Sequence, residues 1–267
     1  MRLRRYFYSR NEYNEEFLSL VLEYMPSSLD RILKEQEKKG EALPVSLIQH
    51  FMFNFMAALN YLHGKGICHR DIKPHNLLVD PVTGMVKLCD FGCSKRLIEG
   101  EPNIQYICAR YYRAPEIVFG WAHYSCAIDL WSAGCVMAEM FTLRPLFPGK
   151  NSIDQLAKIV KLLGSPTPDD LKAMGQASRK VAATGKEIKP RNLEQAFDGI
   201  PVDSLAMDVL NHLLRFDPAK RLLPLATMDH PFFQPVRSRP TGASPALDNT
   251  PSVDLVSNKR PSGTQPS

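Results

Sequence analysis

The sequence lacks the features that mark several protein classes. No apolar run reaches the roughly 18 residues that a membrane span needs, so we expect no membrane partner. The six cysteines form no C-x-x-C pair, and a chain of 267 residues is too large for a disulfide scaffold, so we expect reduced thiols in an intracellular compartment. The opening "MRLRRYFYSR" is basic but no apolar run follows it, which is unlike a secretory signal.

The excess of positive charge is also small. The formal net charge is +5 at pH 7, and the 33 lysines and arginines are scattered along the chain. Nucleic-acid-binding domains gather such residues into stripes with aromatic residues between them, so we expect no nucleic-acid partner. Apolar residues make up 44% of the chain, which is ample for a core in one large domain or two lobes.

The first half of the chain predicts two short strands followed by two helices. The strands are "YFYS" and "FLSLVLEYM", joined by the polar "RNEYNEE". The first helix, "SSLDRILKEQEKKG", has Ser27 or Ser28 as its N-cap and ends at Gly40. The second runs roughly from Val45 to His63, because its apolar residues recur at helical spacing.

The second half predicts helices only, after a strand in "MVKLCDFG". "AIDLWSAGCVMAEMF" is apolar nearly all round, which is typical of a central helix. "SIDQLAKIVKLLG" and "SLAMDVLNHLLRF" are amphipathic. From about Val236 the chain is rich in Ser, Pro, Thr and Asn, and we expect this tail to be disordered. The element order predicts a mainly helical α+β domain with a remnant of sheet at its N-terminus.

An apolar stretch, "ICHRDIKPHNLLVD", carries several polar side chains that suit phosphoryl transfer. Asn76 and Asp90 lie on different segments and offer the oxygen atoms that Mg²⁺ prefers. Asp71 is left to accept a hydroxyl proton, and Lys73 places a positive charge on a transferring phosphoryl group. "HRDIKPHN", "DFG" and "APE" follow each other in the order typical of protein kinases. The motifs therefore predict transfer of a phosphoryl group from ATP, with Mg²⁺ bound beside the phosphates.

Longer segments resemble one kinase family in particular. "ICHRDIKPHNLL", "VKLCDFGCSK", "GEPNIQYICARYYRAPE", "IDLWSAGCVMAEM" and "LFPG" followed by "DQL" are similar to the glycogen synthase kinase-3 family, over about 3–172 and more weakly over 204–233. The resemblance implies a protein-kinase-like α+β fold with a mainly helical C-terminal lobe. It divides the chain into a two-strand remnant of the N-terminal lobe (1–22), a hinge (23–26), the C-terminal lobe (27–235) and a disordered tail (236–267).

The resemblance also implies an activity and the residues that carry it. It implies a serine/threonine protein kinase with Asp71 as the catalytic base, Lys73 as a phosphate contact, and Asn76 and Asp90 as Mg²⁺ ligands. We expect protein substrates and scaffold proteins as partners. We expect the protein in the cytoplasm, and the alternative is that it lies in both the cytoplasm and the nucleus.

The nucleotide pocket follows from the same resemblance. The backbone of Glu23 and Met25 would bond the adenine, Leu78 would lie below the ring, and Cys89 would stand just before the "DFG" motif.

Three further assignments come from the resemblance. Arg70 and Lys95 would form part of a pocket for the priming phosphate of a substrate that is already phosphorylated. Two cations on one phosphate make charge-assisted hydrogen bonds. Tyr106 corresponds to the phosphotyrosine of the activation loop, and Glu116 with Arg221 to the buried ion pair that anchors the end of the activation segment.

The sequence departs from the family in two places. Nothing before Tyr24 resembles the Gly-rich loop, the strand lysine or the helix glutamate that kinases place ahead of the hinge. Residues 174–203 do not follow the family either, which puts the family's scaffold-binding surface in doubt for this chain. Two interpretations fit these departures. The chain is a fragment of an ordinary kinase, or it is a short, catalytically dead module that binds partners. The intact set of Asp71, Asn76 and Asp90 favours the first. We expect this chain alone to be inactive.

Overall fold

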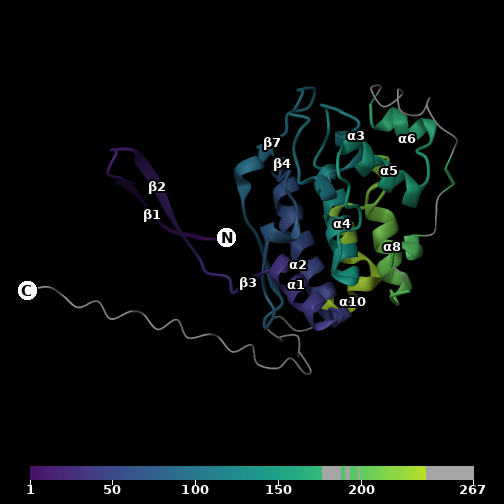
Figure 1. Ribbon diagram of the computed structural model, residues 1–267, viewed down its shortest axis with the longest axis horizontal. Coiled ribbons are helices and arrows are strands. Elements are labelled where there is room, and N and C mark those ends of the chain that lie inside the picture. The colour runs from purple at the N-terminus through teal and green to yellow at the C-terminus, as the bar shows by residue number, and fades with distance from the viewer. Residues whose placement is uncertain (176–187, 190–192, 198, 239–267) are drawn as a thin grey trace, which may run out of the picture.

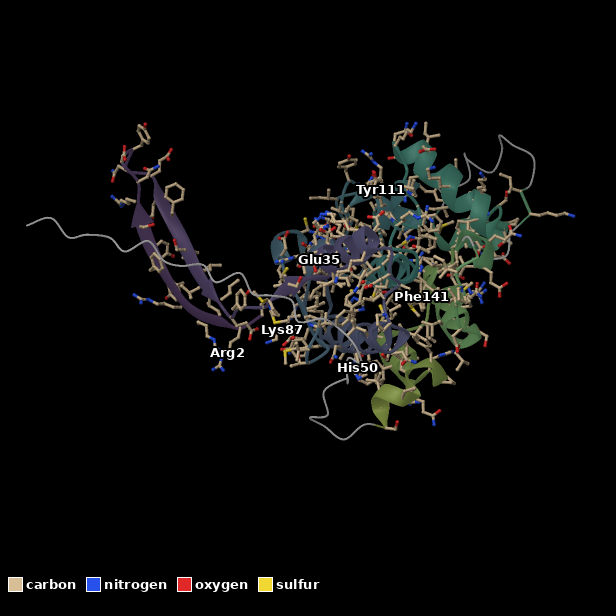
Figure 2. All side chains as sticks on the ribbon, turned by 60° about the horizontal axis from the view of Figure 1, so that its bottom comes forward. Arg2, Glu35, His50, Lys87, Tyr111 and Phe141 are labelled. Atoms are coloured by element: carbon tan, nitrogen blue, oxygen red, sulfur yellow. The ribbon has the colours of Figure 1, made fainter. Side chains whose placement is uncertain are left out.

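The computed structural model describes residues 1–175, 188–189, 193–197 and 199–238. The described chain forms a helical body from which a two-stranded ribbon projects (Figure 1). In Figure 2 the side chains of the ribbon stand apart from the dense body, and Arg2 and Lys87 lie where the two parts join. The mainly helical α+β fold predicted from the sequence is confirmed.

The ribbon consists of β1 (Leu3–Arg10) and β2 (Glu16–Leu22), which pair antiparallel. Both strands were predicted, although β2 ends at Leu22 and not at Met25. Tyr6 faces Leu20 across the ladder, and these side chains are 61% and 55% exposed. The ribbon therefore buries little of its apolar surface.

After the ribbon, the chain enters the body and forms the first strand of a short three-stranded sheet. Its order is β3 (Ser27–Ser28), β5 (Leu77–Asp80) and β6 (Met85–Leu88), all antiparallel. The predicted strand "MVKLCDFG" is shorter than expected, since β6 ends before Cys89. A second small sheet pairs β4 (Ile67–Cys68) with β7 (Lys95–Arg96). These two sheets hold the segments on either side of the polar motif.

Two of the predicted helices have the expected ends. The side chain of Ser28 caps α1 (Leu29–Lys39) by accepting from the backbone N–H of Arg31, and Gly40 ends the helix at φ +69°, a conformation that glycine adopts without strain. Helix α2 spans Val45–His63 as predicted, and its apolar face is buried. It packs against α4, β6 and α9.

Helix α4 (Ala127–Thr142) is the centre of the body, as its apolar sequence predicted. Every residue from Ile128 to Phe141 is buried. Trp131 stacks on Phe147 with the ring planes 17° apart. Full burial of such side chains contributes about 1.5–3 kcal/mol each, so this helix supplies much of the hydrophobic stabilisation.

The described residues form further, mostly short, helical elements besides α1, α2 and α4. They are η1 (Pro74–Asn76), η2 (Phe91–Cys93), η3 (Arg110–Tyr112), α3 (Pro115–Val118), α5 (Ser152–Leu163), α6 (Pro168–Ala173), η5 (Leu193–Phe197), α8 (Ser204–Leu213), η6 (Pro218–Lys220), α9 (Pro224–Asp229), η7 (Pro231–Phe233) and α10 (Gln234–Arg237).

Helix α10 crosses the boundary expected at residue 235, because it continues to Arg237. The rest of the tail, 239–267, and much of 174–203 lie outside the described residues. None of the described helices is long and apolar enough to cross a membrane.

Candidate active site

The carboxylate of Asp71 is held by donors from two segments. Lys73 Nζ lies 2.7 Å from Asp71 Oδ2, and Asn76 Nδ2 donates to the same oxygen at 3.0 Å. The backbone N–H of Ala109, on the segment before η3, donates to Asp71 Oδ1 at 3.2 Å. The structure thus brings together Asp71, Lys73 and Asn76 as predicted and fixes the carboxylate in one orientation.

A buried carboxylate on α4 supports the loop that carries Asp71. Asp129 accepts hydrogen bonds from the backbone N–H groups of His69 and Arg70 at 2.8 and 2.9 Å, and from His63 Nε2 at 3.0 Å. Burial opposes its charge, but these hydrogen bonds prevail and lower the pKa of Asp129. Arg70 has φ +67°, so Asp129 stabilises a backbone turn that is strained for a residue with a Cβ.

His69 packs against the segment of the "DFG" motif and bonds its backbone. Its Nε2 lies 3.1 Å from the carbonyl oxygen of Cys89, and its ring lies 5.1 Å from that of Phe91. Burial lowers the pKa of His69. The neutral imidazole therefore joins the loop of Asp71 to the segment of the "DFG" motif.

Asn76 and Asp90 offer oxygen atoms suited to Mg²⁺. Asn76 uses its amide nitrogen on Asp71, which leaves its amide oxygen for a cation, and its carbonyl accepts from the N–H of Cys89 at 3.0 Å. Asp90 has φ +60° and its carboxylate caps η2 by accepting from the N–H of Gly92. Oxygen donors fit a hard cation that keeps several waters. Within the described ranges no group of three or more His, Cys, Asp or Glu side chains is arranged to hold a metal, so a two-residue site would need phosphate oxygens and water as well.

The predicted hinge joins the ribbon to the body. The N–H of Glu23 donates to the carbonyl of Arg2 at 2.9 Å, so its own carbonyl is the group left for an adenine amino group. The Glu23 carboxylate pairs with Lys87 Nζ at 2.6 Å, and this hydrogen bond lowers the pKa of Glu23. Leu78 lies on β5, and Cys89 follows β6 directly. The structure places these residues on adjoining segments, as an adenine pocket requires.

Arg70 and Lys95 lie near each other in the fold, but each has another partner. The Arg70 guanidinium is buried and donates to the carbonyl of Cys93 and, at 3.2 Å, to the hydroxyl of Tyr124. Lys95 is half-buried and donates to Asn103 Oδ1 at 2.7 Å. A phosphate that entered between the two cations would have to replace these partners.

Tyr106 is exposed and lies beside two arginines. The Arg113 guanidinium stands 4.6 Å from the centre of its ring. Hydrogen bonds from Arg110 and then Arg113 lower the pKa of the Tyr106 hydroxyl. A phosphate added to this hydroxyl would meet both guanidinium groups, which is the geometry that orders a phosphorylated loop.

Glu116 and Arg221 form the predicted ion pair. Arg221 donates through both terminal nitrogens to the two carboxylate oxygens of Glu116, at 2.6 and 2.7 Å, and both side chains are almost fully buried. Arg221 also donates to the carbonyl of Ala127 at 2.9 Å and faces the Trp131 ring. The pair ties α3 to η6 and the start of α4.

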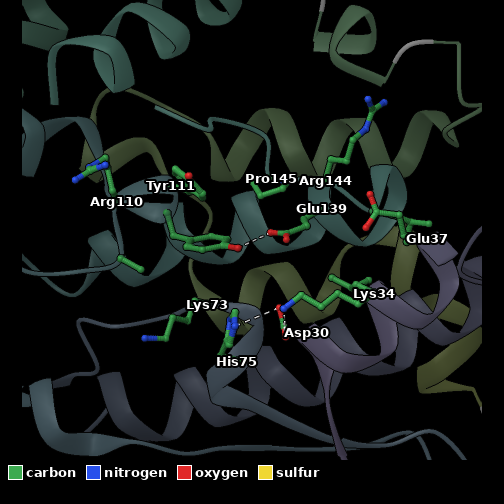
Figure 3. A pocket seen from close by; sticks show the side chains of 14 residues that line it. Asp30, Lys34, Glu37, Lys73, His75, Arg110, Tyr111, Glu139, Arg144 and Pro145 are labelled. Carbon is green, nitrogen blue, oxygen red and sulfur yellow. Dashed lines mark hydrogen bonds and ion pairs between the residues drawn. The ribbon is translucent and has the colours of Figure 1, made fainter. Parts of the chain in front are cut away.

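A cavity of about 460 Å³ lies between α1, η3 and the end of α4 (Figure 3). Tyr112 donates its hydroxyl to Glu139 Oε2 at 2.7 Å in its wall. Burial raises the pKa of Glu139 to about 7. Lys73, which pairs with Asp71, is among the residues that line this cavity.

Two residues of the site escaped the sequence analysis, Asp129 and Glu139. Both are acids within an otherwise apolar helical segment, and an acid in a fully buried helix needs a partner. The presence of an acid in such an apolar segment could therefore have identified both residues from the sequence. The partners themselves, His69 and Tyr112, are remote in sequence and could not be identified from it.

The small sheets, the central helix and the loop of Asp71 define the C-terminal lobe of a protein kinase. The family model of the protein kinase domain matches residues 2–233, so the chain belongs to the protein kinase family.

Two relatives within this family are similar to the chain over most of its length. The chain is 43% identical over 234 residues to "Protein kinase gsk3" of Schizosaccharomyces pombe, which covers 87% of this chain and 59% of the relative. It is 42% identical over 242 residues to "Glycogen synthase kinase 1" of Pyricularia oryzae, which covers 90% of this chain and 60% of the relative. The chain thus spans about three fifths of the length of these relatives.

Proposed function

We propose that this chain carries the catalytic lobe of a serine/threonine protein kinase of the glycogen synthase kinase-3 type. The observation that carries the proposal is the Asp71 carboxylate, which is oriented by Lys73, Asn76 and the N–H of Ala109. A carboxylate that is fixed by donors but is assigned no metal suits a base that receives a hydroxyl proton. The names of the relatives support the same activity.

ATP with Mg²⁺ is the proposed phosphoryl donor. Mg²⁺ would neutralise phosphate charge between the amide oxygen of Asn76 and the carboxylate of Asp90, and the hinge carbonyl of Glu23 would receive the adenine. The residues of this chain then orient the substrate hydroxyl at Asp71 and place the Lys73 ammonium near the moving phosphoryl group.

The proposed substrates are proteins that already carry a phosphate near the target residue. Lys95 and Arg70 supply two cations close to the segment that follows the "DFG" motif. Scaffold proteins as partners, and a cytoplasmic and additionally nuclear location, are proposed on the family resemblance alone.

The experiment measures phosphate transfer from Mg-ATP to a primed serine peptide by the protein purified through a tag at its own gene. We expect transfer by the wild type and its loss in Asp71→Asn. Equal activity of the two proteins would refute Asp71 as the base. If neither protein transfers phosphate but both still bind partner proteins, the result would favour the alternative, a catalytically dead module that binds partners.

A further inference from the structure

A buried glutamine joins α5 to the segment beside Asp71. Gln155 lies in the first turn of α5 and is fully buried. Its amide nitrogen donates to the carbonyl of Tyr111 in η3 at 3.3 Å, and its amide oxygen accepts from the N–H of Gly149 at 3.0 Å. The side chain therefore connects the loop before α5 to η3.

The fold leaves room for this amide and for little else. A Cβ on Gly149 would lie 2.4 Å from the amide oxygen of Gln155 and 2.5 Å from its Cα, so only glycine fits there. Burying an amide is costly unless its polar groups are hydrogen-bonded. Both the oxygen and the nitrogen are bonded here, and both partners are backbone groups. The contact therefore fixes the Tyr111 carbonyl relative to α5.

Element η3 leads directly to the carboxylate of Asp71. Ala109 precedes η3, and its N–H donates to Asp71 Oδ1 at 3.2 Å. The carbonyl of Ala109 accepts from the N–H of Tyr112 at 3.0 Å, so Ala109 and η3 form one hydrogen-bonded turn. Tyr111 lies within this turn. A shift of Tyr111 would therefore displace the N–H that orients Asp71.

Other contacts also hold η3 in place. The hydroxyl of Ser132 donates to the carbonyl of Tyr112 at 2.7 Å, which ties the end of η3 to α4. Arg110 donates to the carbonyl of Lys150 at 2.7 Å. These contacts do not involve Gln155, so we expect its loss to loosen η3 while the body stays folded.

We propose that Gln155 is a positioning residue for phosphate transfer. Its amide fixes η3, and η3 in turn fixes the N–H that orients the Asp71 carboxylate. Gln155 itself touches neither substrate nor nucleotide. The inference rests on the proposed function, because it concerns the orientation of the proposed base. A small misplacement of a catalytic group can lower the rate of a reaction by about 100-fold.

The test compares Gln155→Met with Gln49→Met, both introduced into the tagged gene. Methionine keeps the length of glutamine and removes its hydrogen bonds. Gln49 is the matched control, because its amide nitrogen also donates to a backbone carbonyl, that of Phe232 in η7, at 2.8 Å. Phosphate transfer to a primed peptide, calorimetric titration with Mg-ADP and amide exchange are measured on each protein.

Gln155→Met should lower kcat for the primed peptide by at least about tenfold, because Asp71 loses its fixed orientation. The number of Mg-ADP sites and their Kd should stay within about twofold of the wild type, since the nucleotide is assigned to other segments. Gln49→Met should match the wild type in all three. A loss of transfer in proportion to a loss of Mg-ADP sites would show a purely structural role and would overturn the proposal.

Amide exchange tests the same contact without phosphate transfer. The N–H groups of Tyr112 and Arg113 close η3 on the carbonyls of Ala109 and Arg110, at 3.0 and 3.2 Å. In Gln155→Met these two amides should exchange at least about tenfold faster, and those of α4 should not change. If the wild type transfers no phosphate, the proposed function fails, and exchange still decides whether Gln155 positions η3.

Either of two results in Gln155→Met would also overturn the proposal, a wild-type kcat or unchanged exchange at η3. Gly149→Ala gives a second test with Gln155 in place, because the added methyl group would displace its amide. This variant should also lower kcat and speed exchange at Tyr112. A folded Gly149→Ala protein with normal kcat and normal exchange would contradict the proposal.

Discussion

Lys73 Nζ and Asp71 Oδ2 lie 2.7 Å apart, and Asp71 Oδ1 accepts from the N–H of Ala109 at 3.2 Å. The first contact comes from the same loop as Asp71, and the second comes from the segment just before η3. The carboxylate therefore has its orientation set from two sides. A substrate hydroxyl would meet a base that needs no rearrangement.

Asp71→Asn should lower the rate of phosphate transfer by about 10²–10⁴-fold, because the amide cannot accept the hydroxyl proton. The change keeps the size of the side chain, so the thermal midpoint and nucleotide binding should stay near those of the wild type. Steady-state transfer to a primed peptide and calorimetric titration with Mg-ADP measure the two effects, both on the protein purified through a tag at its own gene. Asp169→Asn, the same change at an exposed position on α6, is the control. Wild-type turnover in Asp71→Asn would refute the assignment.

Arg221→Leu should destabilise the body by about 3–5 kcal/mol, because it leaves the Glu116 carboxylate buried without its partner. Arg237→Leu removes an exposed pair with Asp229 and should cost at most about 1 kcal/mol. Urea unfolding followed by tryptophan fluorescence compares the two variants. Similar losses in both would show that burial of the Glu116 pair does not matter.

Glu139 should make the folded state less stable as the pH rises. Its pKa is raised from 4.5 to about 7 by burial, so between these values the folded chain keeps a proton that the unfolded chain has lost. The stabilisation is complete below about pH 4.5 and is lost as the pH passes about 7. A change of this size corresponds to roughly 3 kcal/mol.

Glu139→Gln tests this dependence, since its amide oxygen can still accept from the Tyr112 hydroxyl. Relative to the wild type, the variant should gain roughly 2–3 kcal/mol between pH 5 and pH 8. Glu41→Gln, the same change at an exposed position, is the matched control. A difference between Glu139→Gln and the wild type that does not change with pH would mean that Glu139 ionises normally in the fold.

Lys95→Ala should reduce use of a primed peptide far more than use of its unphosphorylated counterpart, because only the added phosphate would draw the Lys95 ammonium away from Asn103. Lys95→Arg should retain the preference. High salt should shrink the difference, since charges at a half-buried site are screened within about 8–10 Å. Equal losses on both peptides would indicate that Lys95 only supports the fold through Asn103.

Local patterns were enough to predict much of the fold. The apolar spacing of Val45–His63 and the all-round apolar sequence of α4 each determine a helix without reference to other segments. The motif order placed Asp71 and Asn76 in one site because both lie on one short loop. The support of that loop by Asp129 could not be predicted, since the bonds join residues about 60 positions apart.

The exposed ribbon of β1 and β2 should be the least stable part of the described chain. Two-stranded ribbons are marginal in water, whereas α4 opens only when the whole body unfolds. Amides of Tyr6 and Leu20 should therefore exchange about 10³-fold or more faster than those of α4, measured by mass spectrometry after deuterium labelling. The double variant Leu18→Lys and Leu20→Lys should aggregate less, because both residues are exposed and apolar, while the unfolding midpoint reported by Trp121 and Trp131 in the body stays unchanged. Slow exchange in the ribbon, or a lowered midpoint in the variant, would show that the ribbon packs on the body.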